Sequence, residues 1–366
     1  MRKIFTRKCL TIIATLLCAL TVSAQDFYYD EAPTLAERLS RLENKASVLD
    51  KIKLSGWSQI IYTHDNHNVS TFQLHRARLF IGGDIYNGKK GAKAEFRIQT
   101  EFAGSPKLVD LWLRYRPVKA FGVQLGQFKF PLLMEFTDNY EVEVIDFALA
   151  ILRLQRVGLG DITGISSSGR DIGLQFFGDL ISGDGYSILS YNIALLNGNG
   201  INTRDNNKSK DVVGRLILRP SKRLTITGYY LRGKANVSTP ELIEKFGNVS
   251  IPTHTPVRRY GGGAHYAGRS ITLRAEYIRA RTGNLHSEGA YLLAQYAFMK
   301  NVSVATRLDY FDEDVHTRAN EQNYVVGLNY KPWPMLLLQL NYTYKRYEHT
   351  NQDNVNMISA MTTVRF

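Results

Sequence analysis

Apolar and polar residues alternate with a period of two along most of the chain, from residue 51 to residue 366. In AKAEFRIQTEF, residues 92–102, alanine, phenylalanine and isoleucine alternate with lysine, glutamate, arginine and glutamine. The stretches VSVATRLDYF and LLLQLNYTYKRY repeat the pattern near the end of the chain. Side chains of a β-strand point alternately to its two faces, so this pattern predicts strands with one apolar and one polar face. The alternation therefore indicates an all-β protein.

The alternation divides into sixteen predicted strands. Their ranges are 51–63, 70–84, 91–103, 106–118, 121–130, 169–180, 186–196, 210–219, 222–232, 256–267, 269–281, 289–299, 300–311, 322–332, 335–348 and 354–366. The links after the even-numbered segments are tight. Longer polar links follow several odd-numbered segments, at 131–168, 197–209, 233–255, 282–288 and 312–321.

Short turns at one end and long loops at the other are typical of outer-membrane β-barrels. A sheet in hydrocarbon must pair all of its backbone groups, so we expect the last strand to pair with the first. The prediction is a 16-stranded antiparallel transmembrane β-barrel over residues 51–366.

The first 24 residues have the three parts of a secretory signal peptide. A basic start precedes the apolar stretch LTIIATLLCAL, and small residues end at Ala24. This pattern predicts export and cleavage after Ala24. An alternative is a lipoprotein with Cys18 as its first residue, although Leu17 is larger than the residue such sites prefer. Both cysteines, Cys9 and Cys18, lie in this segment, so the mature protein is expected to contain no disulfide and no cysteine metal site.

Residues 25–50 are predicted to form a periplasmic linker and a short coiled-coil helix. In TLAERLSRLENKASVLD, residues 34–50, leucine and alanine recur at spacings of four and three, and Thr34 with Glu37 has the pattern of a capping box. Such a short seam is marginal alone, so we expect it to assemble a homotrimer. The alternative is an amphipathic helix packed on its own chain.

The charge of the exported chain is basic. Removal of residues 1–24 leaves 42 Lys plus Arg against 33 Asp plus Glu. An exported protein is not expected to meet nucleic acid, so the expected partners are outer-membrane lipid, lipopolysaccharide and small anionic solutes. No later apolar run approaches the roughly 20 residues of a membrane helix.

At VQLGQFKFPLLMEFTDN, residues 123–139, the sequence resembles the phosphate-selective porin O and P family. The family's Gly-Gln-Phe-Lys-x-Pro stretch is matched by Gly126, Gln127, Phe128, Lys129 and Pro131. The stretches QLHRARLFIGGDIY, LVDLWLRYRP and GRDIGLQFFGD also look similar. The resemblance implies a trimeric 16-stranded outer-membrane channel whose third external loop folds inward, with phosphate as a candidate solute.

Residues 131–168 form the longest predicted link, between the fifth and sixth strands. It contains NYEVEVIDFALAILRLQR, a helix-like stretch with Phe147, Ile151 and Leu154. Apolar side chains in an external loop would be left in water, so we expect this segment to fold into the lumen and narrow it. The alternative is an external flap or a subunit contact.

Strand parity predicts which charged side chains face the lumen. The inward bases are Arg76, Arg78, Lys93, Arg97, Arg114, Arg116, Arg215, Arg259, Arg274, Arg307 and Lys345. The inward acids are Glu95, Glu101, Asp110, Asp171, Glu276 and Asp309. Arginine offers forked donors to anion oxygens, so this excess of bases predicts a lumen that favours anions.

The predicted constriction residues are Lys129, Arg153, Arg156 and Arg170. In the alternative interpretation they pair with the loop's own acids and only hold it in place. Those acids are Glu135, Asp138, Glu141, Glu143 and Asp146. Acids in the loop also favour a mild anion preference over a strict one, so the predicted function is a general diffusion channel.

No catalytic, cofactor or metal site is predicted. The acidic stretch DYFDEDVHT lacks the spacing of an EF-hand and is interpreted as an external loop. Two alternatives to a channel remain. An outer-membrane enzyme such as a phospholipase or protease could use His64, His67 or His75 with Asp65 and Ser70. A receptor or structural barrel would use its external loops and would not conduct.

Overall fold

The structure is a computed structural model, and it describes residues 51–67, 70–88, 91–138, 143–157, 160–165, 167–235, 255–317 and 319–366. The predicted signal peptide and the predicted coiled-coil helix lie outside the described residues. Residues Ile52–Phe366 form one folded unit.

The described residues of this unit form sixteen strands and two short helices. The strands are β1 Ile52–Asp65, β2 Thr71–Asn87, β3 Lys93–Glu101, β4 Lys107–Val118, β5 Phe121–Lys129, β6 Arg170–Gly183, β7 Tyr186–Leu196, β8 Asp211–Ser221, β9 Leu224–Ala235, β10 Thr255–Ala267, β11 Ile271–Thr282, β12 Leu285–Met299, β13 Val302–Asp314, β14 Ala319–Trp333, β15 Leu336–Glu348 and β16 Val355–Arg365. The helices, α3 Met134–Thr137 and α4 Leu149–Leu154, both lie between β5 and β6 in the sequence.

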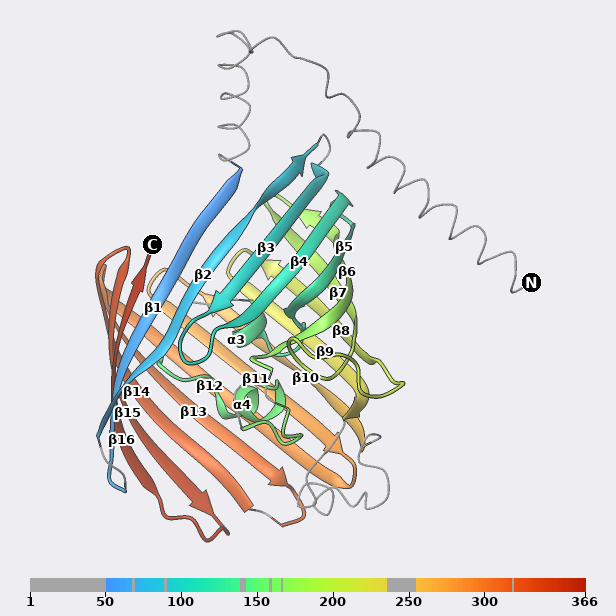
Figure 1. The fold of residues 1–366 in the computed structure, drawn as a ribbon. Coiled ribbons are helices and arrows are strands. Elements are labelled where there is room, and N and C mark those ends of the chain that lie inside the picture. The colour runs from blue at the N-terminus through green and yellow to red at the C-terminus, as the bar shows by residue number, and fades with distance from the viewer. Residues whose placement is uncertain are drawn as a thin grey trace, which may run out of the picture. The chain divides into compact units, whose positions relative to one another are not determined.

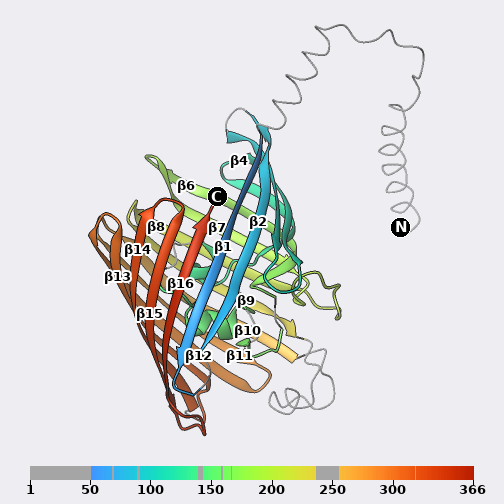
Figure 2. The same ribbon diagram turned by 60° about the vertical axis from the view of Figure 1, so that its left-hand side comes forward.

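The strands form a closed antiparallel barrel in sequence order, with β16 paired to β1 (Figures 1 and 2). The register of the closing pair runs from Trp57 opposite Arg365 to Asp65 opposite Met357. Phe366 completes the closure, because its backbone exchanges hydrogen bonds of 2.9 and 3.0 Å with Gly56. The prediction of a 16-stranded antiparallel barrel is therefore confirmed.

One of the predicted long links is a tight turn in the structure. The link predicted at 282–288 is only residues 283–284, because β11 and β12 continue to the paired residues Thr282 and Leu285. Gly283, at a φ of +60°, makes this tight turn possible. Strand ends beyond the apolar band carry polar residues, so the sequence alone resembles a loop there although the backbone ladder continues.

The strands expose an apolar face outward and a polar face inward. In β12, Leu292 is 52% exposed on the outer face, whereas Leu293 is fully buried on the inner face. Arg259, Arg274 and Arg307 are among the largest fully buried side chains, so the barrel interior holds charge as well as apolar groups.

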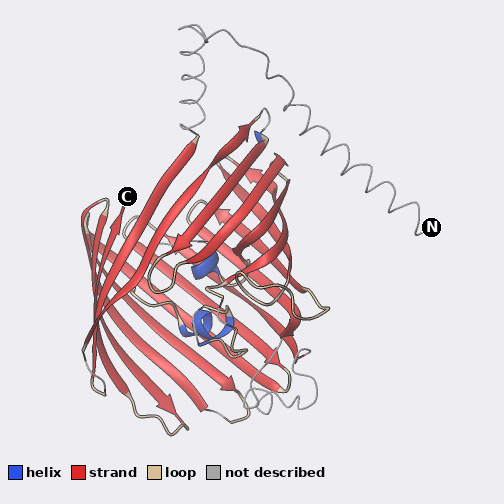
Figure 3. Cartoon of the chain, viewed as in Figure 1, coloured by secondary structure: helices blue, strands red, loops and turns tan. Residues whose placement is uncertain are grey.

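The segment between β5 and β6 packs inside the barrel (Figure 3). Helix α4 contacts β11, β12 and β13, and it approaches β12 so closely that a Cβ on Gly289 would lie 3.0 Å from Cβ of Ala150. Phe130, Leu133 and Ile151 join the buried apolar cluster between this segment and the wall. None of the helices in the described part of the chain has the length and hydropathy of a membrane span.

Candidate functional site: the barrel lumen

The Gly-Gln-Phe-Lys stretch fixes the point where the chain leaves β5 and enters the lumen. Gly126 has a φ of +126°, and a Cβ there would lie 2.1 Å from the carbonyl oxygen of Leu111. Gln127 donates through Nε2 to the carbonyl of Val109 at 2.9 Å, and its Oε1 accepts the backbone N–H of Asn202 at 2.7 Å. These residues join β5 to β4 and to the loop after β7, so the loop segment starts from a fixed base.

Lys129 ends this stretch and faces the segment that follows it. Its Nζ donates to the carbonyl of Phe136 at 2.8 Å and lies 4.5 Å from the centre of the Phe136 ring. Arg170, at the return of the segment, pairs with Asp110 at 2.9 Å.

Inward arginines of distant strands hold the loop segment in place. Arg215 of β8 makes two hydrogen bonds to Asp138, at 2.7 and 2.6 Å, and Arg274 of β11 makes two to Glu143, at 3.3 and 2.5 Å. Arg307 of β13 donates to the carbonyl of Asp146 at 2.6 Å. Asp138 and Glu143 are thus paired with strand arginines, and burial raises the pKa of the Glu143 carboxyl although Arg274 opposes this shift.

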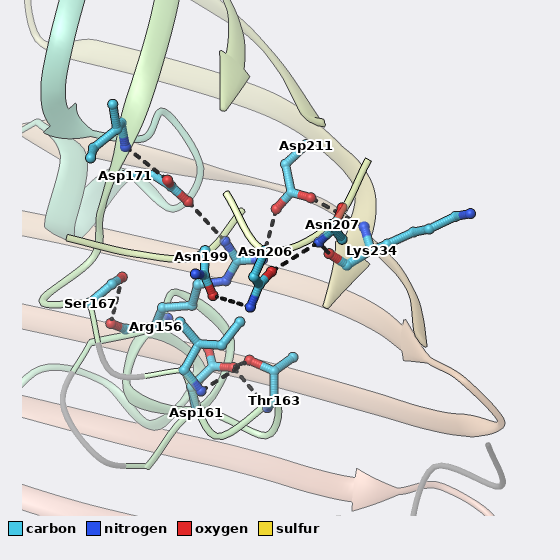
Figure 4. A network of polar contacts seen from close by, with 12 residues as sticks. Arg156, Asp161, Thr163, Ser167, Asp171, Asn199, Asn206, Asn207, Asp211 and Lys234 are labelled. Atoms are coloured by element: carbon cyan, nitrogen blue, oxygen red, sulfur yellow. Dashed lines mark hydrogen bonds and ion pairs between the residues drawn. The ribbon is translucent and has the colours of Figure 1, made fainter. Parts of the chain in front are cut away.

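Arg156 is the centre of a second, fully buried anchor (Figure 4). Its guanidinium pairs with Asp171 at 3.2 Å and Asp211 at 2.8 Å, and its backbone N–H donates to Asp161 at 2.6 Å. Asp161 also pairs with Arg259 at 3.2 Å. Burial alone would lower the pKa of Arg156, but the surrounding aspartates raise it, so this group is a fixed positive charge. Arg156 has a φ of +54°, a conformation that this network holds.

The other half of the lumen contains a cavity of about 950 Å³, lined mainly by the inner faces of β1–β6 and by the loop segment. Two tryptophans on its wall lie under arginines of neighbouring strands. Arg76 and Arg78 lie 5.8 and 5.7 Å from the ring centre of Trp57, and Arg97 and Arg114 lie 5.6 and 4.8 Å from that of Trp112. Such contacts hold guanidinium groups along the wall and leave their charge intact.

Three of these arginines have no carboxylate partner. Arg76 donates to the amide oxygen of Gln59 at 3.2 Å, and Arg114 donates twice to that of Gln124, at 3.1 and 2.7 Å. Among the described residues, Arg76, Arg97 and Arg114 form no ion pair, whereas Arg78 pairs with Glu101 at 2.6 Å. The wall of β2–β4 therefore carries positive charge toward the cavity.

A smaller cavity of about 310 Å³ lies beside the loop ends of β13–β16, with Lys345 in its lining. Asp146, Phe147, Leu152 and Val157 line both cavities. The loop segment therefore separates a hollow near the long loops from the larger cavity, which extends to Phe366 at the end with the short turns.

Lys93 and Arg116, predicted to face the lumen, and Arg153, predicted at the constriction, lie outside the larger cavity. Lys93 pairs with Asp84 at 3.0 Å and with Glu95 at 2.7 Å. Arg116 lies 4.0 Å from Asp179, and Arg153 pairs with Glu321 at 2.7 Å.

Sequence reasoning did not identify Trp57 and Trp112 as lumen residues. The signal was present, because Trp112 shares the strand parity of Asp110 and Arg114, which were assigned inward. Parity was applied to charged residues alone, so both aromatic rings were missed.

The three histidines of the enzyme alternative have different contacts. His64 Nδ1 lies 2.8 Å from the hydroxyl of Ser70, and His67 contacts Asn66 and the carbonyl of Asn354. His75 borders the larger cavity instead. No cluster of three metal-ligating side chains occurs among the residues described above.

Solved structures with a similar fold are porins and related outer-membrane proteins. An anion-selective porin from Comamonas acidovorans has a TM-score of 0.67 at 12% identity, covering 86% of this chain and 99% of that chain. OmpT of Vibrio cholerae has a TM-score of 0.65 at 9% identity, covering 86% and 97%. OmpF of Salmonella typhi, in complex with daunomycin, has a TM-score of 0.64 at 13% identity, covering 86% and 97%. At these identities the likeness shows the fold alone.

A search of curated protein sequences found no match. The family model described as phosphate-selective porin O and P matches residues 59–366, which include every strand from the middle of β1 onward. This match spans most of the chain, and the closed barrel agrees with it. The chain therefore belongs to the phosphate-selective porin O and P family.

Proposed function

We propose that this outer-membrane protein forms a water-filled diffusion channel with a mild preference for anions. The observation that carries this proposal is the cluster of Arg76, Arg97 and Arg114, which face the larger cavity without a carboxylate partner among the described residues. One charge at about 5 Å changes the energy of an ion by roughly 1 kcal/mol in water. Three such charges favour anions without binding them so tightly that they cannot leave.

The solute path runs from the hollow beside β13–β16, past the loop segment, into the larger cavity. The passage is bordered by Asp146 and Phe147, and Arg76 lies 5.3 Å from the ring centre of Phe147. A base and an acid at the same passage support a mild preference over a strict one.

The predicted lumen arginines divide into two roles. Arg156, Arg259 and Arg274 are fully buried and paired, so we assign them to holding the loop segment, away from the solute path. Arg307 borders the smaller cavity, but it is paired with Asp309. Lys129 and Arg170 border the larger cavity and contact the Phe136 carbonyl and Asp110. They contribute to the narrow part of the path but are not its main source of charge.

Phosphate and small carboxylates are the solutes that suit this wall, because arginine binds their oxygens with paired donors. The channel needs no chemical step, so we propose no catalytic role. A homotrimer is the proposed assembly, supported by the trimer form of OmpT from Vibrio cholerae, which shares the fold.

The test is the reversal potential of the purified mature protein in a planar bilayer under a potassium chloride gradient. We expect a stable conductance and a reversal potential directed toward chloride. Phosphate added to one side should then lower the chloride current. A reversal directed toward potassium would place the acids of the loop segment at the narrowest point and contradict the anion preference. The absence of any conductance would favour a receptor or enzyme barrel.

A further inference from the structure

Strands β9, β10 and β11 are neighbours in the barrel wall (Figure 1). Each carries an exposed arginine near its loop end. The strand registers place Arg258 opposite Arg232 on one side and opposite Arg281 on the other. All three side chains are exposed, whereas the adjacent residues Leu231 and Val257 are buried on the inner face. We call Arg232, Arg258 and Arg281 the arginine row.

The arginine row lacks an anion within the described protein. Like charges directly opposite each other on neighbouring strands destabilise a sheet. Arg232 and Arg258 make no hydrogen bond or ion pair with any described residue, and Arg281 donates only to the carbonyl of Gly283, at 3.2 Å. Neighbouring Arg279 differs, because its Nε lies 3.4 Å from a carboxylate oxygen of Glu288. The row therefore concentrates charge that an external anion would stabilise.

The level of the row on the barrel indicates what that anion is. Tyr230 and Tyr260 face each other across β9 and β10, two residues from Arg232 and Arg258 toward the middle of the barrel, and both are about half exposed. Exposed tyrosines of a β-barrel mark the membrane–water interface. The arginines thus lie at the level of lipid headgroups, on the side of the long loops, which is the external side. Lys234 adds charge beyond Arg232, and its side chain points away from the Arg156 network (Figure 4).

We propose that the arginine row binds the phosphate groups of a lipopolysaccharide molecule in the outer leaflet. The paired N–H donors of a guanidinium group match phosphate oxygens, and clusters of basic residues beside a membrane bind phosphorylated headgroups. The acyl chains lie along the apolar strand surface below Tyr230 and Tyr260. This site is on the opposite face of the wall from the lumen, so it acts independently of the diffusion channel.

The first experiment measures binding of bisphosphorylated lipid A to the whole mature protein in detergent by native mass spectrometry. R232Q/R258Q/R281Q is expected to bind on the order of 100-fold more weakly, because each basic residue near a charged membrane contributes several-fold in affinity. The control K222Q/R223Q/R269Q removes three charges from the short turns at the opposite ends of these strands and should keep wild-type affinity. Lipid A without phosphate should bind the wild type as weakly as the variant.

Equal affinity of the wild type and R232Q/R258Q/R281Q would overturn the proposal, as would an equal loss in the control. Conductance checks folding, and it should be unchanged in both variants because neither alters the lumen.

Thermal unfolding is a second readout. Without lipid, Arg258→Gln should raise the unfolding temperature by relieving repulsion, and the increase caused by added lipid A should be smaller than in the wild type. A lower temperature together with an undiminished lipid effect would contradict the site.

Discussion

The two halves of the lumen use arginine in opposite ways. Along β8–β13, Arg215, Arg274 and Arg307 contact Asp138, Glu143 and the Asp146 carbonyl, so their charge holds the loop segment. Along β2–β4, arginines lie over Trp57 and Trp112 and hydrogen-bond to neutral amides.

This difference shows that an arginine facing the lumen does not by itself determine ion selectivity. A guanidinium paired with a buried carboxylate adds no net charge to the solute path, whereas one supported by an aromatic ring and a neutral amide keeps its charge. We call these halves the anchored half and the open half. Three changes test whether they differ as described.

The largest effect is expected in the anchored half. Arg156→Gln should destabilise the loop segment by about 3–5 kcal/mol, because it leaves Asp171 and Asp211 buried without their base. We expect a larger and noisier conductance and faster proteolysis within residues 143–169. Arg153→Gln is the matched control, because Arg153 is on the same segment but 36% exposed and paired with Glu321, so it should cost less than about 1 kcal/mol. Similar behaviour of both variants would contradict the assignment of Arg156 as the residue that holds the loop segment.

The second effect concerns charge in the open half. Arg97→Gln with Arg114→Gln should lower the chloride-to-potassium permeability ratio by roughly fivefold, which corresponds to about 1 kcal/mol. Lys93→Gln with Arg116→Gln removes two charges from the same strands outside the larger cavity and should have a smaller effect. Reversal potentials of the two double variants provide the comparison. A larger shift of the reversal potential in the Lys93→Gln/Arg116→Gln variant would indicate that selectivity arises near the short turns.

The smallest effect should come from pH, through Glu143 in the anchored half. Burial raises the pKa of its carboxyl, so it takes up a proton at a higher pH than an exposed glutamate. The folded state binds this proton more tightly than the unfolded chain, so Glu143 favours folding at low pH, and this contribution disappears as the pH rises through the raised pKa. Glu143→Gln lacks this titrating group, so acidification should stabilise the wild type more than Glu143→Gln, as measured by the unfolding temperature at each pH. Identical pH profiles would show that other acids control the effect.

Strand parity predicted much of the open half from the sequence. Arg76, Arg97 and Arg114 were assigned to the lumen from alternation alone, and they line the larger cavity. The assignment was possible because a strand has a fixed two-residue period, so one apolar face determines the direction of every other side chain.

The same reasoning could not predict the anchored half. Arg274 pairs with Glu143 across 131 positions, and Arg156 pairs with Asp211 across 55. No local pattern determines which base meets which acid when the two lie on different strands and on a loop.

The period of alternation, the number of strands and the direction of each side chain were therefore properties of the sequence by itself. Which arginines keep their charge was decided only by the tertiary structure. The physical reason is that ion pairing depends on distances of about 3 Å between side chains, and those distances arise only when the loop segment packs against the closed wall.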